Sequence, residues 1–230
     1  MEMKIRDIMN ELGGAFTVAW VIMGITLLPE EEGFSAELAG LGMASLGGML
    51  ALGIAWKAFD GADILPPITW MKALTSDDLT DQNMWTSTII RLITQVVGAI
   101  LATMLLANTY EDQFVTYEMG QLVNPSVTWS FALWSVVGLI AAGAILWQIS
   151  TKVSNEWAMP IAVMALASTS IVEFGSAVDM ASMLMNATGD AVATASFWLI
   201  NGVLIGVGAL MGMMIDGFIT DMDSDDSSSE

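Results

Sequence analysis

The chain has 230 residues, of which 55% are hydrophobic and 13% charged, and its formal net charge is −19. A soluble domain of this size carries about a quarter charged residues, so the apolar excess points to a lipid environment. There is no cysteine and no histidine, which excludes thiolate and imidazole metal sites and the nucleophile systems built on them. No basic surface exists for nucleic acid, and we expect a protein that is not an enzyme and has no cofactor or metal.

Six apolar segments are long enough to cross a bilayer, which takes roughly 20 residues each. They occupy about 11–28, 37–57, 85–108, 128–149, 157–173 and 193–217. Polar or acidic breaks separate them, and the longest break covers about 109–127. The sequence therefore predicts an all-α integral membrane protein with six transmembrane helices.

Two further apolar pieces, at about 65–74 and 180–188, are too short to cross. Each follows a turn that contains a glycine, Gly61 or Gly175. Non-helical backbone at membrane depth is tolerated where it is buried in protein or lines a water-filled cavity. We therefore expect two re-entrant half-helices whose tips meet near the midplane and form a pore.

The order of two spans, one short piece and one span occurs twice along the chain. Each half holds three spans, so the second half would enter the membrane inverted relative to the first. We predict an inverted repeat over 1–115 and 116–219, followed by a disordered acidic tail at 220–230.

The basic residues all fall on one predicted side of the membrane. They are Lys4, Arg6, Lys57, Lys72, Arg91 and Lys152. The predicted connections on the other side, at about 29–36, 109–127 and 174–192, contain none. Lys and Arg prefer cytoplasmic loops, so we expect a plasma-membrane protein with both termini cytoplasmic.

Several short motifs resemble the aquaporin (major intrinsic protein) family. Segment 61–69 reads GADILPPIT, where the family has GAHxNPAVT, and segment 175–182 reads GSAVDMAS, where the family has GxxxNPAR. Segments 11–16 (ELGGAF), 95–99 (QVVGA) and 202–206 (GVLIG) are similar to the family's motifs in spans 1, 3 and 6. The resemblance implies an aquaporin-like right-handed bundle that assembles as a homotetramer in lipid, with one pore per protomer.

The resemblance also identifies the tips of the two half-helices. They are Leu65, Pro66, Pro67, Asp179, Met180 and Ala181. Leu65 and Asp179 stand where the family has asparagines that donate hydrogen bonds to the passing solute. Leu65 cannot donate, and an ionised Asp179 would accept rather than donate. Backbone N–H groups and the helix dipoles would remain as the barrier to cations.

Four small side chains fall at the family's constriction positions: Ser45, Ala167, Ser176 and Ser182. They imply a wider, uncharged opening that admits larger polar solutes as well as water. Four polar residues are expected near the pore mouth or as supports of the loops: Glu11, Asp63, Gln95 and Glu173.

The resemblance implies that Glu11 accepts hydrogen bonds from the backbone of the first re-entrant loop. Asp63, in place of a family histidine, would either line the inner vestibule or cap the turn. Glu173 would lie either in a wet interfacial mouth or in the pore. Glycines at 202, 206, 208 and 212 have the four-residue spacing that lets helices approach closely inside a protomer.

These features predict a passive channel for water and/or small neutral solutes such as glycerol. A cation-permeable pore of the same fold and a non-conducting membrane scaffold are alternatives. A secondary transporter or formate–nitrite-type channel is a further alternative, but we would expect it to carry a central histidine.

Overall fold

The computed structural model describes residues 3–26, 43–109, 132–168 and 191–227, and all the regular structure in these segments is helical. The elements are α1 (Ile5–Thr26), α2 (Met43–Ala58), α3 (Pro66–Leu74), α4 (Gln82–Thr109), α6 (Leu133–Lys152), α7 (Ala158–Ser168) and α9 (Ala191–Ser227). The predicted all-α class is confirmed, and each of the six predicted spans overlaps one of these helices. The short apolar piece at 65–74 is a separate helix, α3.

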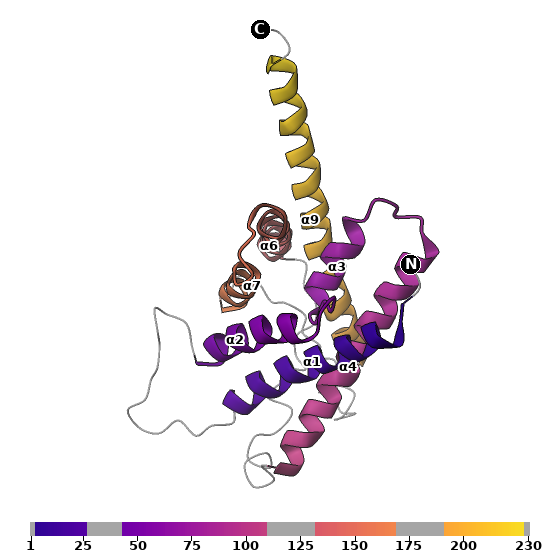
Figure 1. The fold of residues 1–230 in the computed structure, drawn as a ribbon, viewed down its shortest axis with the longest axis vertical. Helices are drawn as coiled ribbons and strands as arrows, with labels where there is room; N and C mark the ends of the chain where they lie inside the picture. Colours follow the sequence, from indigo (N-terminus) through magenta and orange to yellow (C-terminus); the bar gives the residue numbers. More distant parts are fainter. Residues whose placement is uncertain (1–2, 27–42, 110–131, 169–190, 228–230) are drawn as a thin grey trace.

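The helices pack in two groups that contact each other (Figure 1). In the first group α1 packs against α2 and α4, and in the second group α6 packs against α7 and α9. The groups are joined by a contact between α2 and α7 and by contacts of α3 with α9 and α6. The short helix α3 also contacts α4, so it lies where the two groups meet.

Three helices are long and apolar enough to cross a membrane by length and composition: Gln82–Thr109, Leu133–Lys152 and Trp198–Thr220. In α2 and α7 the apolar stretches within the described residues are shorter, at Leu46–Ala58 and Ala158–Ala167. The first half of α1 carries polar residues, among them Arg6, Asp7 and Glu11. The structure thus supports a helical membrane protein.

The structure continues a helix into the acidic tail from residue 220, for which the sequence predicts disorder. Helix α9 continues to Ser227, and it extends past the other helices in Figure 1. No glycine or proline follows Gly217 in this helix. Adding a residue to a helix that has already formed costs little free energy, because nucleation is the unfavourable step. At 37 residues α9 is about 55 Å long, which exceeds the roughly 30 Å of a bilayer core.

Glycines let α6 and α9 approach until their backbones touch. A Cβ atom on Gly143 would lie 1.9 Å from the carbonyl oxygen of Ile205, and one on Gly208 would lie 2.0 Å from that of Ile140. Gly212 faces α6 in the same way, at Ala144. Packing within one protomer, predicted from the glycine spacing, is therefore confirmed for these positions.

We expect Gly208→Ala to destabilise the protein, because the added methyl group meets backbone that cannot move without separating the two helices. Overpacking of this kind costs about 1–3 kcal/mol, or several degrees of melting temperature in detergent. Gly217→Ala in the same helix is the matched control, since nothing lies within 4 Å of the added atom. Thermal unfolding followed by size-exclusion chromatography measures both. Equal melting temperatures for the two variants would contradict this packing.

Candidate functional site

The carboxylate of Glu11 holds the loop that leads into α3. Glu11 lies on α1 and is fully buried. Its Oε2 accepts the backbone N–H of Asp63 at 2.9 Å, and its Oε1 accepts that of Ile64 at 2.6 Å. The predicted hydrogen bonds from the loop backbone to Glu11 are present. They pair two backbone donors that would otherwise be buried without a partner.

Two residues of α4, one helical turn apart, complete the coordination of this carboxylate. Arg91 Nη1 donates to Glu11 Oε2 at 2.6 Å and to the carbonyl of Gly61 at 2.9 Å. Gln95 Nε2 donates to Glu11 Oε1 at 2.6 Å and to Thr69 Oγ1 at 2.8 Å. Residues four apart lie on the same face of a helix. One face of α4 therefore donates hydrogen bonds to Glu11, to the loop and to the first turn of α3.

The loop backbone is bent sharply where Glu11 holds it. Ile64 has a φ of 68°, in the left-handed region that a β-branched residue rarely adopts. The N–H of Leu65 donates to the carbonyl of Asp63 at 2.8 Å, which closes a γ-turn around Ile64. A positive φ at such a residue costs about 1–3 kcal/mol and persists where the surroundings hold it. Gly61 also has a positive φ, of 78°, and adopts it without this cost because glycine has no Cβ atom.

Asp63 takes part in an ion pair that neither sequence-based alternative included. Its buried carboxylate lies 2.5 Å from Lys72 Nζ and 3.6 Å from Arg91 Nη1. Its carbonyl accepts the indole N–H of Trp56 at 3.1 Å. The two acidic residues, Glu11 and Asp63, are thus balanced by two basic ones. Salt bridges tie the loop to both α3 and α4.

The tip of α3 has no free backbone N–H group. Leu65 occupies the N-cap position without a side-chain cap, and Pro66 and Pro67 follow it. Ile68 and Thr69 both donate to the carbonyl of Leu65, each at 3.1 Å. The N–H groups before the prolines are used as well, by Glu11 and by the γ-turn. Two prolines remove donors and the turn uses the others, so no unpaired backbone N–H group is left at this tip.

Within the described residues, the segments at 11–16, 95–99 and 202–206 that carry the family resemblance lie close together near α3 and its loop. A Cβ on Gly14 of α1 would lie 2.6 Å from Ile64, and one on Gly98 of α4 would lie 2.7 Å from the carbonyl of Leu12. On α9, Gly202 and Gly206 lie against α3, with Trp70 as their shared neighbour.

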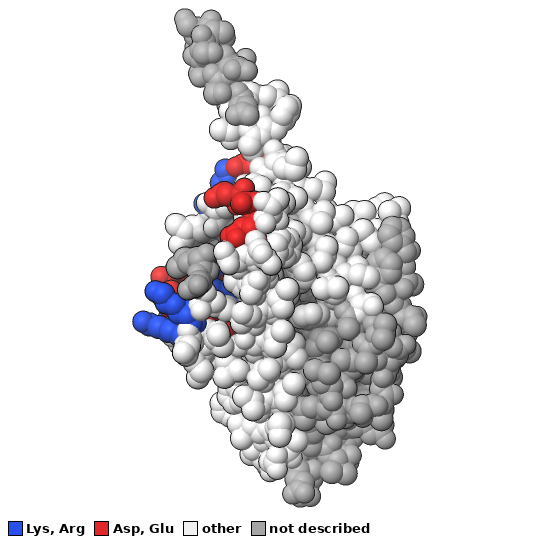
Figure 2. Space-filling view, turned by 90° about the vertical axis from the view of Figure 1, so that its right-hand side faces the viewer, with Lys and Arg blue, Asp and Glu red and all other residues white. Residues whose placement is uncertain are grey.

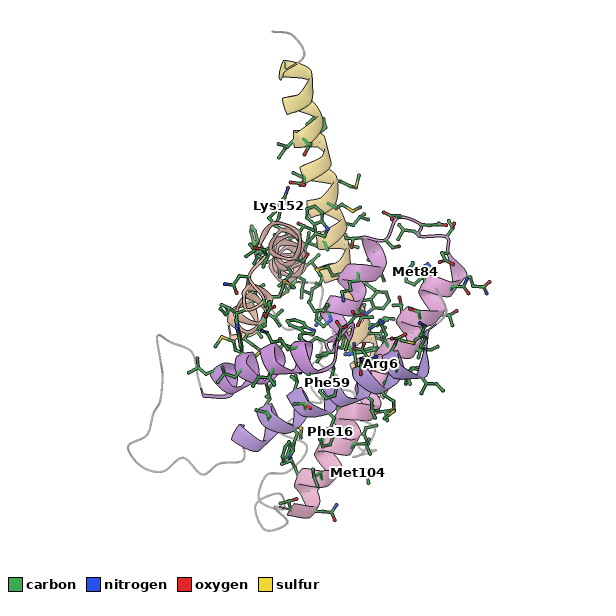
Figure 3. All side chains as sticks on the ribbon, viewed as in Figure 1. Arg6, Phe16, Phe59, Met84, Met104 and Lys152 are labelled. Atoms are coloured by element: carbon green, nitrogen blue, oxygen red, sulfur yellow. The ribbon has the colours of Figure 1, made fainter. Side chains whose placement is uncertain are left out.

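Phe59, which follows α2 and is labelled in Figure 3, lies with its ring against Gly13 of α1. Tight packing at these glycines therefore places the short helix and its loop among α1, α4 and α9.

Charged residues gather at one edge of the molecule in Figure 2, and the other described surface in that view carries none. Lys57 at the end of α2 pairs with Glu156 before α7. Lys152 at the end of α6 pairs with Asp216 of α9 at 2.9 Å (Figure 3). These exposed pairs join the helix ends that carry the basic residues.

Several predicted site residues fall outside the described part of the chain: Glu173, Ser176, Asp179, Met180, Ala181 and Ser182. Ser45 lies in α2, but its side chain is not described. Ala167 is exposed near the end of α7. Among the described candidates, the structure brings Glu11, Asp63 and Gln95 together with the tip of α3.

The sequence did not predict that Arg91, Lys72 and Trp56 contact this site. Arg91 and Lys72 entered the sequence analysis only as basic residues that indicate membrane orientation. The four-residue spacing of Arg91 and Gln95 on one helix was a usable signal. Nothing local to Lys72 or Trp56 indicates their contacts with Asp63.

No known family model matches this chain, and no curated protein sequence matches it either. The site is therefore interpreted from its own contacts and from the motifs that carry the resemblance.

We expect Glu11→Gln to destabilise the fold strongly. A glutamine retains one acceptor oxygen but leaves Arg91 without its nearest carboxylate in a buried site. Removing one partner of a buried ion pair costs about 3–5 kcal/mol, or about 10 °C in melting temperature for a chain of this size.

The matched control is Lys57→Gln, which breaks an ion pair whose side chains are 57% and 67% exposed. Exposed pairs contribute about 0–1 kcal/mol, so its melting temperature should stay near that of the wild type. A Glu11→Gln protein as stable as this control would show that the hydrogen bonds and the ion pair of Glu11 do not hold the loop.

Proposed function

We propose that this protein is a passive transmembrane channel of aquaporin type, for water and/or small neutral solutes such as glycerol. One observation carries the proposal. A nine-residue helix, α3, begins inside an apolar helical bundle, and buried side chains hold the loop that leads to it.

The length of α3 is the first reason for this interpretation. Nine residues make a helix about 14 Å long, less than half the roughly 30 Å of a bilayer core. Its residues Pro66 to Thr69 are buried, and so is the loop residue Ile64. Irregular backbone at membrane depth must be buried in protein or line a cavity that holds water. Broken helices inside a bundle are a recurring design of membrane passages.

The pairing of helices supports an inverted repeat of three spans in each half. The contact between α1 and α4 corresponds to that between α6 and α9, and the contact between α1 and α2 corresponds to that between α6 and α7. The α2–α7 contact joins equivalent helices of the two halves. In this proposal α1, α2, α4, α6, α7 and α9 are the six spans, and segment 180–188 is the counterpart of α3.

Large apolar side chains on the outer surface favour a lipid environment for this bundle. Exposed examples on α4 are Ile89, Ile93, Val97, Leu101 and Leu105. They recur every four residues, as on a helix face turned to lipid or to a neighbouring protomer. We propose a plasma-membrane homotetramer with cytoplasmic termini, in keeping with the positions of the basic residues.

Transport would proceed down the solute's gradient without covalent chemistry. Selection would rest on the size of the opening and on the groups that line it, including the small residues at positions 45, 167, 176 and 182. The ion pairs among Glu11, Arg91, Asp63 and Lys72 would hold α3 in place while solutes pass.

Stopped-flow light scattering on purified protein in liposomes tests the proposal. We expect water efflux or glycerol entry severalfold faster than in empty liposomes. Ser182→Trp should return the rate to background because it fills the proposed opening. Gly217→Trp adds the same bulk to α9 at an exposed position, where nothing lies within 4 Å of an added Cβ atom, and it should conduct like the wild type.

Background rates for both solutes from folded wild-type protein would overturn the proposal. Potassium current across a planar bilayer, measured on the same preparation, would favour the cation-permeable alternative. Absence of both neutral flux and current would favour a scaffold.

A further inference from the structure

Two cations at the start of α1 have no acidic partner among the residues that the structure describes. Lys4 and Arg6 are both exposed, and Arg6 is labelled in Figure 3. Neither takes part in an ion pair with another described residue. The other four basic residues of the chain each pair with a carboxylate: Lys57, Lys72, Arg91 and Lys152. Two unpaired cations so close together are unexpected in a chain with 25 acidic residues and 6 basic ones.

The contacts of this segment hold its backbone and leave the two cations free. Asp7 Oδ2 accepts the backbone N–H of Lys4 at 2.9 Å, and the carbonyl of Lys4 accepts the N–H groups of Asp7 and Ile8. The side-chain amide of Asn10 donates to the carbonyl of Asp60 at 2.8 Å, which fastens this end of α1 to the turn after α2. The start of α1 is therefore held against the protein while both cationic side chains remain exposed.

Exposed apolar side chains lie beside the two cations. Ile5 is 81% exposed, more than any other large hydrophobic side chain in the described residues, and Met9 is 56% exposed. The two are four residues apart and so lie on the same face of α1, with Arg6 next to Ile5 in the chain. The apolar span predicted for this helix begins at about residue 11, so this turn lies just before it. Apolar and basic side chains together at such a place are typical of a helix turn in the membrane interface.

A bilayer leaflet that contains anionic phospholipid covers both kinds of side chain at once. Its acyl boundary takes up Ile5 and Met9, and its phosphate groups pair with Lys4 and Arg6, whose carbon stems can lie along the apolar surface. A second copy of this turn would instead bring like charges together. An acidic protein segment would neutralise the cations but would leave the apolar side chains in water unless it brought apolar residues of its own.

We infer that Lys4 and Arg6, together with Ile5 and Met9, form a binding surface for the headgroups of anionic phospholipids in the adjacent leaflet. This surface is independent of conduction and requires only that the protein lies in a bilayer. The net charge of −19 does not prevent the interaction, because charges further away than a Debye length of about 8–10 Å are largely screened.

The test measures which lipid lies beside this turn. The chain has no cysteine, so Met9→Cys takes a single fluorescent label. The labelled protein is placed in vesicles of equal parts phosphatidylglycerol and phosphatidylcholine, with bromine atoms on the acyl chains of one lipid or the other. Bromine quenches the label on contact, and the ratio of the two quenching strengths gives the preference for anionic lipid. Labelling Met3→Cys instead gives a second reading that leaves Met9 in place.

We expect the starting protein to prefer the anionic lipid severalfold. Lys4→Gln and Arg6→Gln should each lower the preference by about two- to fivefold, and the double variant should show a ratio near one, because each basic residue near an anionic surface adds to the attraction. About 1 M sodium chloride shortens the Debye length to about 3 Å and should remove the preference.

The matched controls are Lys57→Gln and Lys152→Gln. Each also removes one positive charge, but from a cation that already pairs with a carboxylate, so the preference should stay as in the starting protein. Inorganic phosphate should act no more strongly than chloride at the same ionic strength.

A ratio near one in the starting protein, or no quenching by either lipid, would overturn the inference. So would equal losses in Lys4→Gln and Lys57→Gln, because net charge alone would then explain the preference. Displacement by inorganic phosphate beyond the effect of chloride would show a site for free phosphate and not for the leaflet. None of these results depends on water or glycerol flux, so they leave the proposed function to its own test.

Discussion

The hydrogen bonds accepted by the buried carboxylate of Glu11 are the interactions on which the described part of this protein depends. A carboxylate has about four acceptor sites, and leaving them empty in an apolar interior is costly. Four donors fill them here: the N–H groups of Asp63 and Ile64 and the side chains of Arg91 and Gln95. These bonds come from one loop and one helix. They therefore fix the position of α1, α4 and the start of α3 with respect to one another.

This arrangement explains how a helix can begin in the middle of an apolar bundle. A buried chain reversal exposes backbone groups that water cannot reach, and each must find a partner in the protein. Glu11 pairs two of the N–H groups, Arg91 and Trp56 pair two of the carbonyls, and the γ-turn at Ile64 pairs one of each. Charge balance with Lys72 and Arg91 keeps Asp63 in the same interior.

The pairing of polar groups inside the protein also limits which groups of α3 and its loop could contact a solute in the proposed passage. Groups that hold the loop cannot also bind a solute, and the prolines that start α3 remove two donors where a helix would usually offer them. The interior around α3 is instead closed by tight packing at glycines: Gly14 lies against Ile64, and Gly202 and Gly206 lie against Trp70. Lipid supplies no hydrophobic force between helices, so close packing of small residues and buried hydrogen bonds must hold such a bundle together.

The sequence by itself determined the helical class, the approximate position of the described helices and the short helix after Gly61, although α1 begins before the predicted span and α9 ends well after it. Apolar length, glycine and proline are local signals, which is why these predictions hold. The bond between Glu11 and the loop was also expected, although from the family resemblance and not from any local pattern.

Only the tertiary structure decided which charged residues meet and which acceptors pair the buried backbone N–H groups of the loop. Glu11 and Gln95 are 84 residues apart in the chain, and no local pattern specifies that they touch. The ion pair of Asp63 with Arg91 and the N–H groups of Asp63 and Ile64 bonded to Glu11 likewise depend on how distant segments pack. Secondary structure follows from neighbours along the chain, whereas the partners of buried polar groups are chosen when the helices come together.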